Sequence, residues 1–200
     1  MTRFISPLLA AAALSLAGCA STYVSPVEVN RFVGAAPARL GNGTIAVRAA
    51  PGEAGGSLEF AAYQQAVAAE LAQLGYRVVE SGGAAQLAEL RVARSAERPL
   101  TGGRSPVNVG VGGSTGSYGS GLGLGVGINL GGGRPKEVID TGIGVIIRDG
   151  ASGQALWEGR ASFSASANSD YADRQAAAGR LADALFAGFP GESGETIEVK

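Results

Sequence analysis

The chain has 200 residues, with 16 basic and 17 acidic side chains, one cysteine and no histidine. Its length suits one domain with a hydrophobic core, and its balanced charge argues against nucleic acid as a partner. Without histidine the chain cannot form a Ser-His-Asp triad, a Cys-His dyad or the usual zinc sites, so we expect no cofactor and no metal.

The N-terminus has the pattern of an export signal. One basic residue, Arg3, precedes an apolar stretch of 14 residues from Phe4 to Ala17. This stretch is shorter than the roughly 20 residues that a membrane-spanning helix needs, and it suits the apolar region of a signal peptide. The alternative is a core helix that ends in cysteine, but that does not account for the order of charge, apolar run and small residues.

The run Leu16-Ala17-Gly18-Cys19 resembles the lipobox of bacterial lipoproteins. The resemblance implies cleavage between Gly18 and Cys19 and lipid attachment to the Cys19 thiol, so that acyl chains hold the protein on a membrane. Ala20 then occupies the next position, where aspartate favours inner-membrane retention in sorting of the enterobacterial kind. We therefore expect a lipid-anchored protein on the periplasmic face of the outer membrane, with no disulfide.

These features suggest a division of the chain. We expect a signal peptide over residues 1–18, a lipidated cysteine and tether over 19–42, a folded domain over 43–192 and a C-terminal tail over 193–200. The tether assignment has an alternative, because Val27, Val29 and Phe32 could form a short first strand. A tether would let the domain stand off the membrane.

The domain begins with a predicted strand, helix and strand. The strand covers residues 44–47, and Ser57 can cap a helix that begins at Leu58. Gly75 can end this helix in the left-handed conformation. One apolar face of the helix contains Tyr63, Val67, Leu71 and Leu74. Further strands are expected over residues 76–79 and around Leu90, which alternates with charged neighbours.

A glycine-rich insert covers residues 102–133, with 14 glycines in 32 positions. Apolar residues alternate with polar residues or glycine over 107–111 and 122–130, and this period of two predicts a hairpin with its turn near 114–120. An exposed or edge hairpin is one interpretation. The other is a hairpin that enters a membrane or assembles with copies of itself, because segment 122–130 approaches the length of a tilted transmembrane strand.

A second hairpin and a helix complete the domain. Ile143, Val145 and Ile147 lie on one face of a strand, and Trp157, Ala161 and Phe163 lie on one face of the return strand. Asp149 and residues 150–153 supply the turn. Asp170 can cap a last helix over 171–187, with Asp173 also compensating the helix dipole. This order of elements favours an α+β fold, in which two helices pack on one face of an antiparallel sheet of several strands.

Three stretches of the chain resemble the DUF4136 family of bacterial lipoproteins, which share a domain of unknown function. They are residues 70–76 with the following 87–94, the hairpin over 147–161, with its Asp-turn-Gly and Leu-Trp-x-Gly pattern, and the closing helix that runs into Phe189-Pro190. The resemblance covers roughly residues 44–190. It implies a fold and an envelope location, and it supplies no catalytic residues.

We therefore expect a noncatalytic envelope protein that binds or scaffolds another component. Its partners would be the membrane, through acyl chains on Cys19, and an unidentified envelope protein or polymer. One alternative is an oligomeric pore-forming lipoprotein that uses the glycine-rich hairpin over residues 107–130. A second is a carboxylate-dependent hydrolase, which requires two acidic side chains that converge in a cleft.

Overall fold

The computed structural model describes residues 22–80, 82–97, 107–112, 123–128 and 137–200. The strands are β1 (Val27–Val33), β2 (Thr44–Ala49), β3 (Arg77–Val78), β4 (Gln86–Glu97), β5 (Val107–Gly112), β6 (Gly123–Ile128), β7 (Val138–Asp149), β8 (Ala155–Ser166) and β9 (Thr196–Val199). The helices are α2 (Leu58–Gln73) and α3 (Arg174–Phe186), with short 3-10 turns η2 (Pro37–Arg39) and η3 (Asp170–Ala172).

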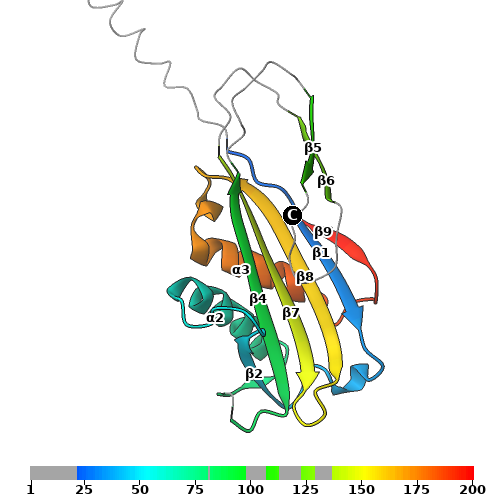
Figure 1. The fold of residues 1–200 in the computed structure, drawn as a ribbon. Coiled ribbons are helices and arrows are strands. Elements are labelled where there is room, and N and C mark those ends of the chain that lie inside the picture. The colour runs from blue at the N-terminus through cyan, green and yellow to red at the C-terminus, as the bar shows by residue number, and fades with distance from the viewer. Residues whose placement is uncertain (1–21, 81, 98–106, 113–122, 129–136) are drawn as a thin grey trace, which may run out of the picture.

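Seven of these strands form one sheet in the order β3-β2-β4-β7-β8-β1-β9, and helices α2 and α3 cover one of its faces (Figure 1). Its centre is the long β4, β7 and β8, which pair antiparallel along their length. Strands β5 and β6 form a separate antiparallel pair, in which Val107 lies opposite Ile128. The turn predicted near 114–120 lies outside the described residues.

The prediction of an antiparallel sheet is wrong, because the sheet is mixed. Strand β2 pairs in parallel with both β3 and β4, and Ile45 lies opposite Gln86 in the second pairing. The cause is the helix between these strands. After β2, helix α2 carries the chain back to the end of the sheet where β2 began, so the next strand runs in the same direction. The prediction of two helices on one face is confirmed.

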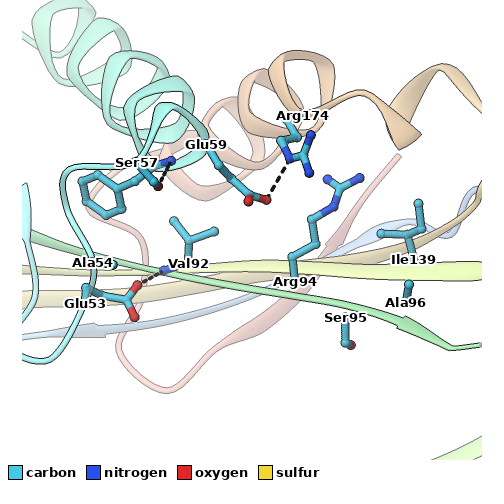
Figure 2. Close-up of a pocket in the computed structure, with 11 residues that line it drawn as sticks. Glu53, Ala54, Ser57, Glu59, Val92, Arg94, Ser95, Ala96, Ile139 and Arg174 are labelled. Atoms are coloured by element: carbon cyan, nitrogen blue, oxygen red, sulfur yellow. Dashed lines mark hydrogen bonds and ion pairs between the residues drawn. The ribbon is translucent and has the colours of Figure 1, made fainter.

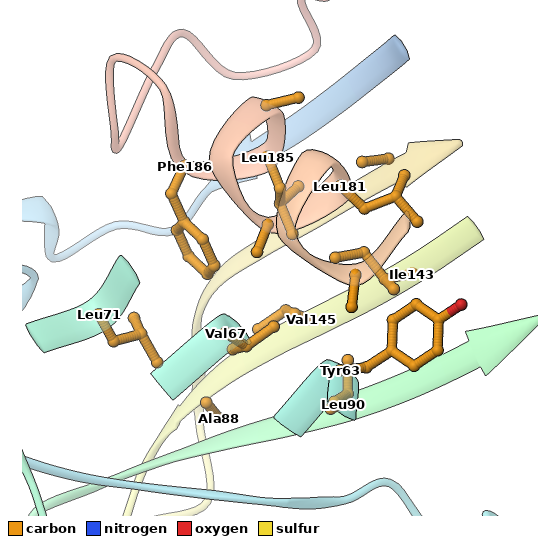
Figure 3. Close-up of a cluster of buried hydrophobic side chains, with 14 of the residues drawn as sticks. Tyr63, Val67, Leu71, Ala88, Leu90, Ile143, Val145, Leu181, Leu185 and Phe186 are labelled. Atoms are coloured by element: carbon orange, nitrogen blue, oxygen red, sulfur yellow. The ribbon is translucent and has the colours of Figure 1, made fainter. Parts of the chain in front are cut away.

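The core fills the space between the helices and the sheet (Figure 3). From α2, the predicted face contributes Tyr63, Val67 and Leu71, each with no exposed surface. From α3, Leu181 and Leu185 are equally buried. These side chains pack on inward residues of the central strands, which include Ala88, Leu90, Ile143 and Val145. Because the helices run over adjacent strands, one contiguous core joins them.

Local hydrogen bonds set the helix ends. The Ser57 hydroxyl accepts the Phe60 amide at 3.0 Å, and Gly75 ends α2 with φ +99°, as predicted. The prediction for α3 is wrong by three residues. Asp173 caps that helix by accepting the Ala176 amide at 3.0 Å, whereas Asp170 begins the preceding turn η3. Two aspartates three residues apart are equally good caps by sequence, and the chain uses the second.

Two segments that the predicted boundaries leave outside the domain are strands of the sheet. Residues 27–33 form β1 between β8 and β9, so this part of the segment expected as a tether takes the alternative, a first strand. Residues 196–199, within the predicted tail, form β9 against β1. An inward arginine, Arg31, obscures the alternation of β1. It is only 4% exposed and donates to the Leu185 carbonyl at 3.0 Å, at the end of α3.

The Leu-Trp-x-Gly pattern has a steric explanation in the packing of β8. Trp157 and Gly159 point to the same face of the strand, and the indole ring lies directly over the glycine. A Cβ added at Gly159 would stand 2.2 Å from Trp157 Cη2 and 2.8 Å from Leu185 Cδ1, so only glycine fits. The ring also packs on Phe186 at a centroid distance of 5.5 Å, and its Nε1 donates to the Pro190 carbonyl at 2.9 Å.

Candidate functional site

The predicted cleavage and lipidation residues, Gly18 and Cys19, lie outside the described residues. The described chain starts close to them and is bound to the sheet almost at once. The Tyr23 carbonyl accepts the Ser166 amide at 2.9 Å, and the Tyr23 amide donates to Ser166 Oγ at 3.0 Å. Val24 then forms a bridge with Ala165. The sheet therefore holds the chain from the fourth residue after Cys19 onward.

A cleft of about 590 Å³ opens between the first turns of the two helices, the end of β4 and the start of β7 (Figure 2). Its polar lining consists of Glu53, Ser57, Glu59, Arg94, Ser95 and Arg174. Segments far apart in the sequence thus meet at one place. Because Arg174 Nε and Glu59 Oε1 are 3.0 Å apart, an ion pair joins the first turns of α2 and α3.

Most polar groups of this cleft also hold the structure together. Glu53 Oε2 accepts the Val92 amide at 3.0 Å, which fixes the loop before α2 on β4. Arg94 Nη2 donates to the Ala172 carbonyl at 2.5 Å, which ties η3 to the same strand. The guanidinium and carboxylate groups that line the cleft are thus already engaged within the fold.

Behind the cleft, Tyr63 meets Arg94. The Tyr63 hydroxyl is fully buried and makes no hydrogen bond of regular geometry within the described part of the chain. Burial raises the pKa of Tyr63, and the neighbouring Arg94 guanidinium offsets part of this increase. A buried neutral hydroxyl beside a cation supplies polarity without a group that titrates near neutral pH.

The open face of the sheet carries a second cluster, which the sequence pattern does not reveal. Glu89 is 6% exposed and pairs with Arg48 at 2.7 Å and with Arg148 at 2.9 Å. Burial tends to raise the pKa of Glu89, but the hydrogen bonds from Arg148 and Arg48 together bring it below its usual value. The three residues come from neighbouring strands β2, β4 and β7, so only the strand order could have indicated them.

Asp149 is a turn residue, as the sequence predicts. Its Oδ1 accepts both the Ser152 hydroxyl at 2.6 Å and the Ser152 amide at 2.8 Å, and its other oxygen pairs with Arg39. The hydrogen bonds from Ser152, with that from Arg39, lower the pKa of Asp149 to about 2. The carboxylate therefore remains ionised and holds the hairpin turn against η2.

The described residues show neither a metal-binding cluster nor a membrane-spanning helix. Within the described residues, no group of three or more histidine, cysteine, aspartate or glutamate side chains could hold a metal ion. In the same part of the chain, each helix is too short or too polar to cross a membrane. Asp170 and Asp173, two carboxylates three residues apart, serve in a 3-10 turn and a helix cap respectively.

The sequence matches one family of known proteins over most of its length. The family model described as a domain of unknown function, DUF4136, matches residues 47–191, which is more than half of the chain. An uncharacterized protein of Zymomonas mobilis is 53% identical over 47 residues, which make up 24% of this chain and 18% of that protein. The chain therefore matches less than a fifth of that relative's length.

Two solved structures of low sequence identity align with much of this chain. A PDZ domain protein from Parabacteroides distasonis aligns with a TM-score of 0.50 and 14% identity, over 89% of this chain and 38% of that one. A PelC dodecamer from Paraburkholderia phytofirmans aligns with a TM-score of 0.45 and 12% identity, over 84% of this chain and 99% of that one. At 14% identity, the similarity to the Parabacteroides protein concerns the fold alone.

Proposed function

The chain belongs to the DUF4136 family of domains of unknown function, and we propose that it is a lipid-anchored protein on the periplasmic face of the outer membrane. Its role there is to bind or scaffold another envelope component, without catalysis. The observation that carries the proposal is the run Leu16-Ala17-Gly18-Cys19 after a short apolar stretch, which contains the chain's one cysteine. Several acyl chains on this residue suffice for stable attachment, whereas one chain holds only marginally.

The noncatalytic part of the proposal is supported by the inventory of side chains. The chain has no histidine to serve as a base near neutral pH, and lipidation uses its one thiol. In the cleft, Glu53 accepts a backbone amide and Glu59 pairs with Arg174. Carboxylates that already have hydrogen-bond or ion-pair partners suit ligand recognition better than acid–base catalysis.

Replacement of the cysteine tests the anchor. In Cys19→Ser the lipid acceptor is lost, so we expect the protein to leave the lipidated membrane fraction and to accumulate unprocessed or in soluble form. Ser21→Ala, two residues further on, is the matched control and should fractionate as the wild type does. Membrane fractionation with intact-mass measurement provides the readout. Unchanged mass and membrane association of Cys19→Ser would contradict the proposal.

The outer-membrane location has its own test. Ala20→Asp introduces the residue that favours inner-membrane retention in an enterobacterial host, so this variant should shift to the inner-membrane fraction while keeping its lipid. Density-gradient separation of the two membranes gives the distribution. If the wild type already sediments with the inner membrane, the location is wrong although the anchor stands.

A further inference from the structure

We propose that one end of the sheet, formed by Tyr23, Glu97, Val138 and Ser166, is the surface that faces the lipid bilayer. We call this end the anchor rim. The inference rests on the proposed lipidation of Cys19 and adds to it an orientation and an interaction surface, with the bilayer as the occupant.

Only a short length of chain separates the lipidated residue from the fold. Only Ala20, Ser21 and Thr22 separate Cys19 from Tyr23, and Tyr23 already pairs with Ser166 at the end of β8. Four residue steps span at most about 14 Å when fully extended. A lipidated Cys19 sulfur lies at the level of the lipid headgroups, so the anchor rim is confined close to that level.

The end of β8, the start of β7 and the end of β4 lie side by side at this rim. Ser166 lies opposite Val138 at the start of β7, and Val138 lies opposite Glu97 at the end of β4. Neighbouring strands are about 4.8 Å apart, so Glu97 is roughly 15 Å from Tyr23 across the sheet. Strand β4 therefore ends and strand β7 begins on the side of the domain that faces the membrane.

An exposed aromatic side chain lies on the rim close to the anchor. Tyr23 is 56% exposed, although large apolar side chains are otherwise mostly buried in the described residues. Tyrosine suits the boundary of a membrane, because its ring is apolar and its hydroxyl can remain in the polar headgroup layer. Tyr23, the fourth residue after Cys19, thus has a side chain that suits a membrane boundary.

The opposite end of the sheet provides the contrast. Strand β7 runs from Val138 at the rim to Asp149 at the far turn, and at about 3.3 Å per residue its length is roughly 36 Å. With the rim against the bilayer, the far turn over residues 150–153 is the end of the sheet that extends away from it. The far turn, with its neighbouring Asp149–Arg39 pair, is then the part of the domain that points toward the periplasm.

Fluorescence quenching in vesicles tests this orientation. Ala96→Cys, next to Glu97, and Ala151→Cys, in the far turn, are matched exposed alanines. Since lipidation consumes Cys19, each variant carries one free thiol for an environment-insensitive fluorophore. The labelled lipoproteins are reconstituted in vesicles of phosphatidylethanolamine with some phosphatidylglycerol and a nitroxide-headgroup lipid. Vesicles without the nitroxide lipid provide the reference intensity.

We expect loss of fluorescence at position 96 and none at position 151. Equal quenching at both positions, which a domain lying flat would give, or stronger quenching at position 151 overturns the inference. Intact mass separates this failure from that of the proposed function. A protein that carries acyl chains but shows the wrong quenching pattern contradicts only the orientation, whereas a protein without acyl chains contradicts both.

Discussion

The two faces of the sheet are made by the same strands and have opposite chemistry. On the face under the helices, Leu90, Val145 and Trp157 are at most 1% exposed and belong to the contiguous core. The open face presents charged side chains at neighbouring positions, such as Glu89 and Glu158, which are held by arginines. Stability is therefore concentrated on the helix-covered face, because burial of apolar surface contributes more than exposed ion pairs.

The largest expected effect is on the helix-covered face at Trp157. Trp157→Ala removes the ring that packs on Phe186 and Phe189, together with the hydrogen bond to the Pro190 carbonyl. We expect a loss of about 3–5 kcal/mol in the free energy of unfolding, as for large aromatic truncations in cores. Urea denaturation followed by circular dichroism measures it. A loss below about 1 kcal/mol would contradict the assignment of Trp157 to the core.

A pair of strand glycines compares the two faces directly. Gly159→Ala on the helix-covered face places a Cβ 2.2 Å from the Trp157 ring, so we expect a loss of about 1–3 kcal/mol through overpacking. Gly144→Ala, in the adjacent strand on the open face, meets only Arg160 Cγ at 4.0 Å and should be neutral or slightly stabilising. The stability difference is measured from the urea midpoints of the two variants, provided that the slope of the unfolding free energy against urea concentration is unchanged. Equal losses in the two variants would remove the distinction between the faces.

A smaller effect is expected on the open face itself. Glu89→Gln removes the charge between Arg48 and Arg148, and these arginines are 45% and 32% exposed, so water can solvate them. We expect a loss of about 1–2 kcal/mol. Glu158→Gln, in the exposed pair with Arg160, is the control and should cost less than about 1 kcal/mol. A greater loss of stability in Glu158→Gln than in Glu89→Gln would mean that solvent exposure does not determine how much these ion pairs contribute.

The smallest effect at neutral pH is expected at the far turn. In Asp149→Asn the amide oxygen of the new side chain can still accept the hydrogen bond from the Ser152 amide. The ion pair with Arg39 is lost, but the Arg39 side chain is half exposed and water can solvate it. The pKa of Asp149 is lowered from 3.8 to about 2, so its ionised form stabilises the fold above pH 3.8, and this contribution disappears as the pH falls toward 2.

The variant should therefore lose less stability than the wild type between pH 3.8 and about 2. Glu89 responds to acid in the same direction, so both proteins retain some pH dependence, and the difference between them isolates Asp149. Urea midpoints across this range measure that difference. Parallel curves for the two proteins would show that the pKa of Asp149 is the same in the folded and unfolded chain.

Local sequence patterns predict the parts of the fold that short-range chemistry determines. The alternation of Ile143, Val145 and Ile147 predicts β7 and its buried face, and Ser57 and Gly75 predict the ends of α2. The direction in which two strands pair is not determined by such local patterns. Alternation shows which side of a strand is buried but not which strand lies beside it, so the parallel pairing of β2 with β4 is missed.

Long-range contacts explain the other misses. Arg31 interrupts the apolar pattern of β1, because its partners are carbonyls at the end of α3, more than 150 residues later. The cleft likewise joins the loop before α2, the end of β4 and the start of α3, and no local spacing connects Glu59 with Arg174. The signal for Cys19, by contrast, lies within four consecutive residues, and the sequence alone therefore supplies it.

The mass of the protein purified from the envelope tests the central claim most directly. If the account is correct, the mature chain begins at Cys19, lacks the 18 preceding residues and carries the added mass of acyl chains on that residue. A chain that retains Met1, or one that begins elsewhere with a free cysteine thiol, would contradict the claim that lipid on Cys19 holds this domain at the membrane.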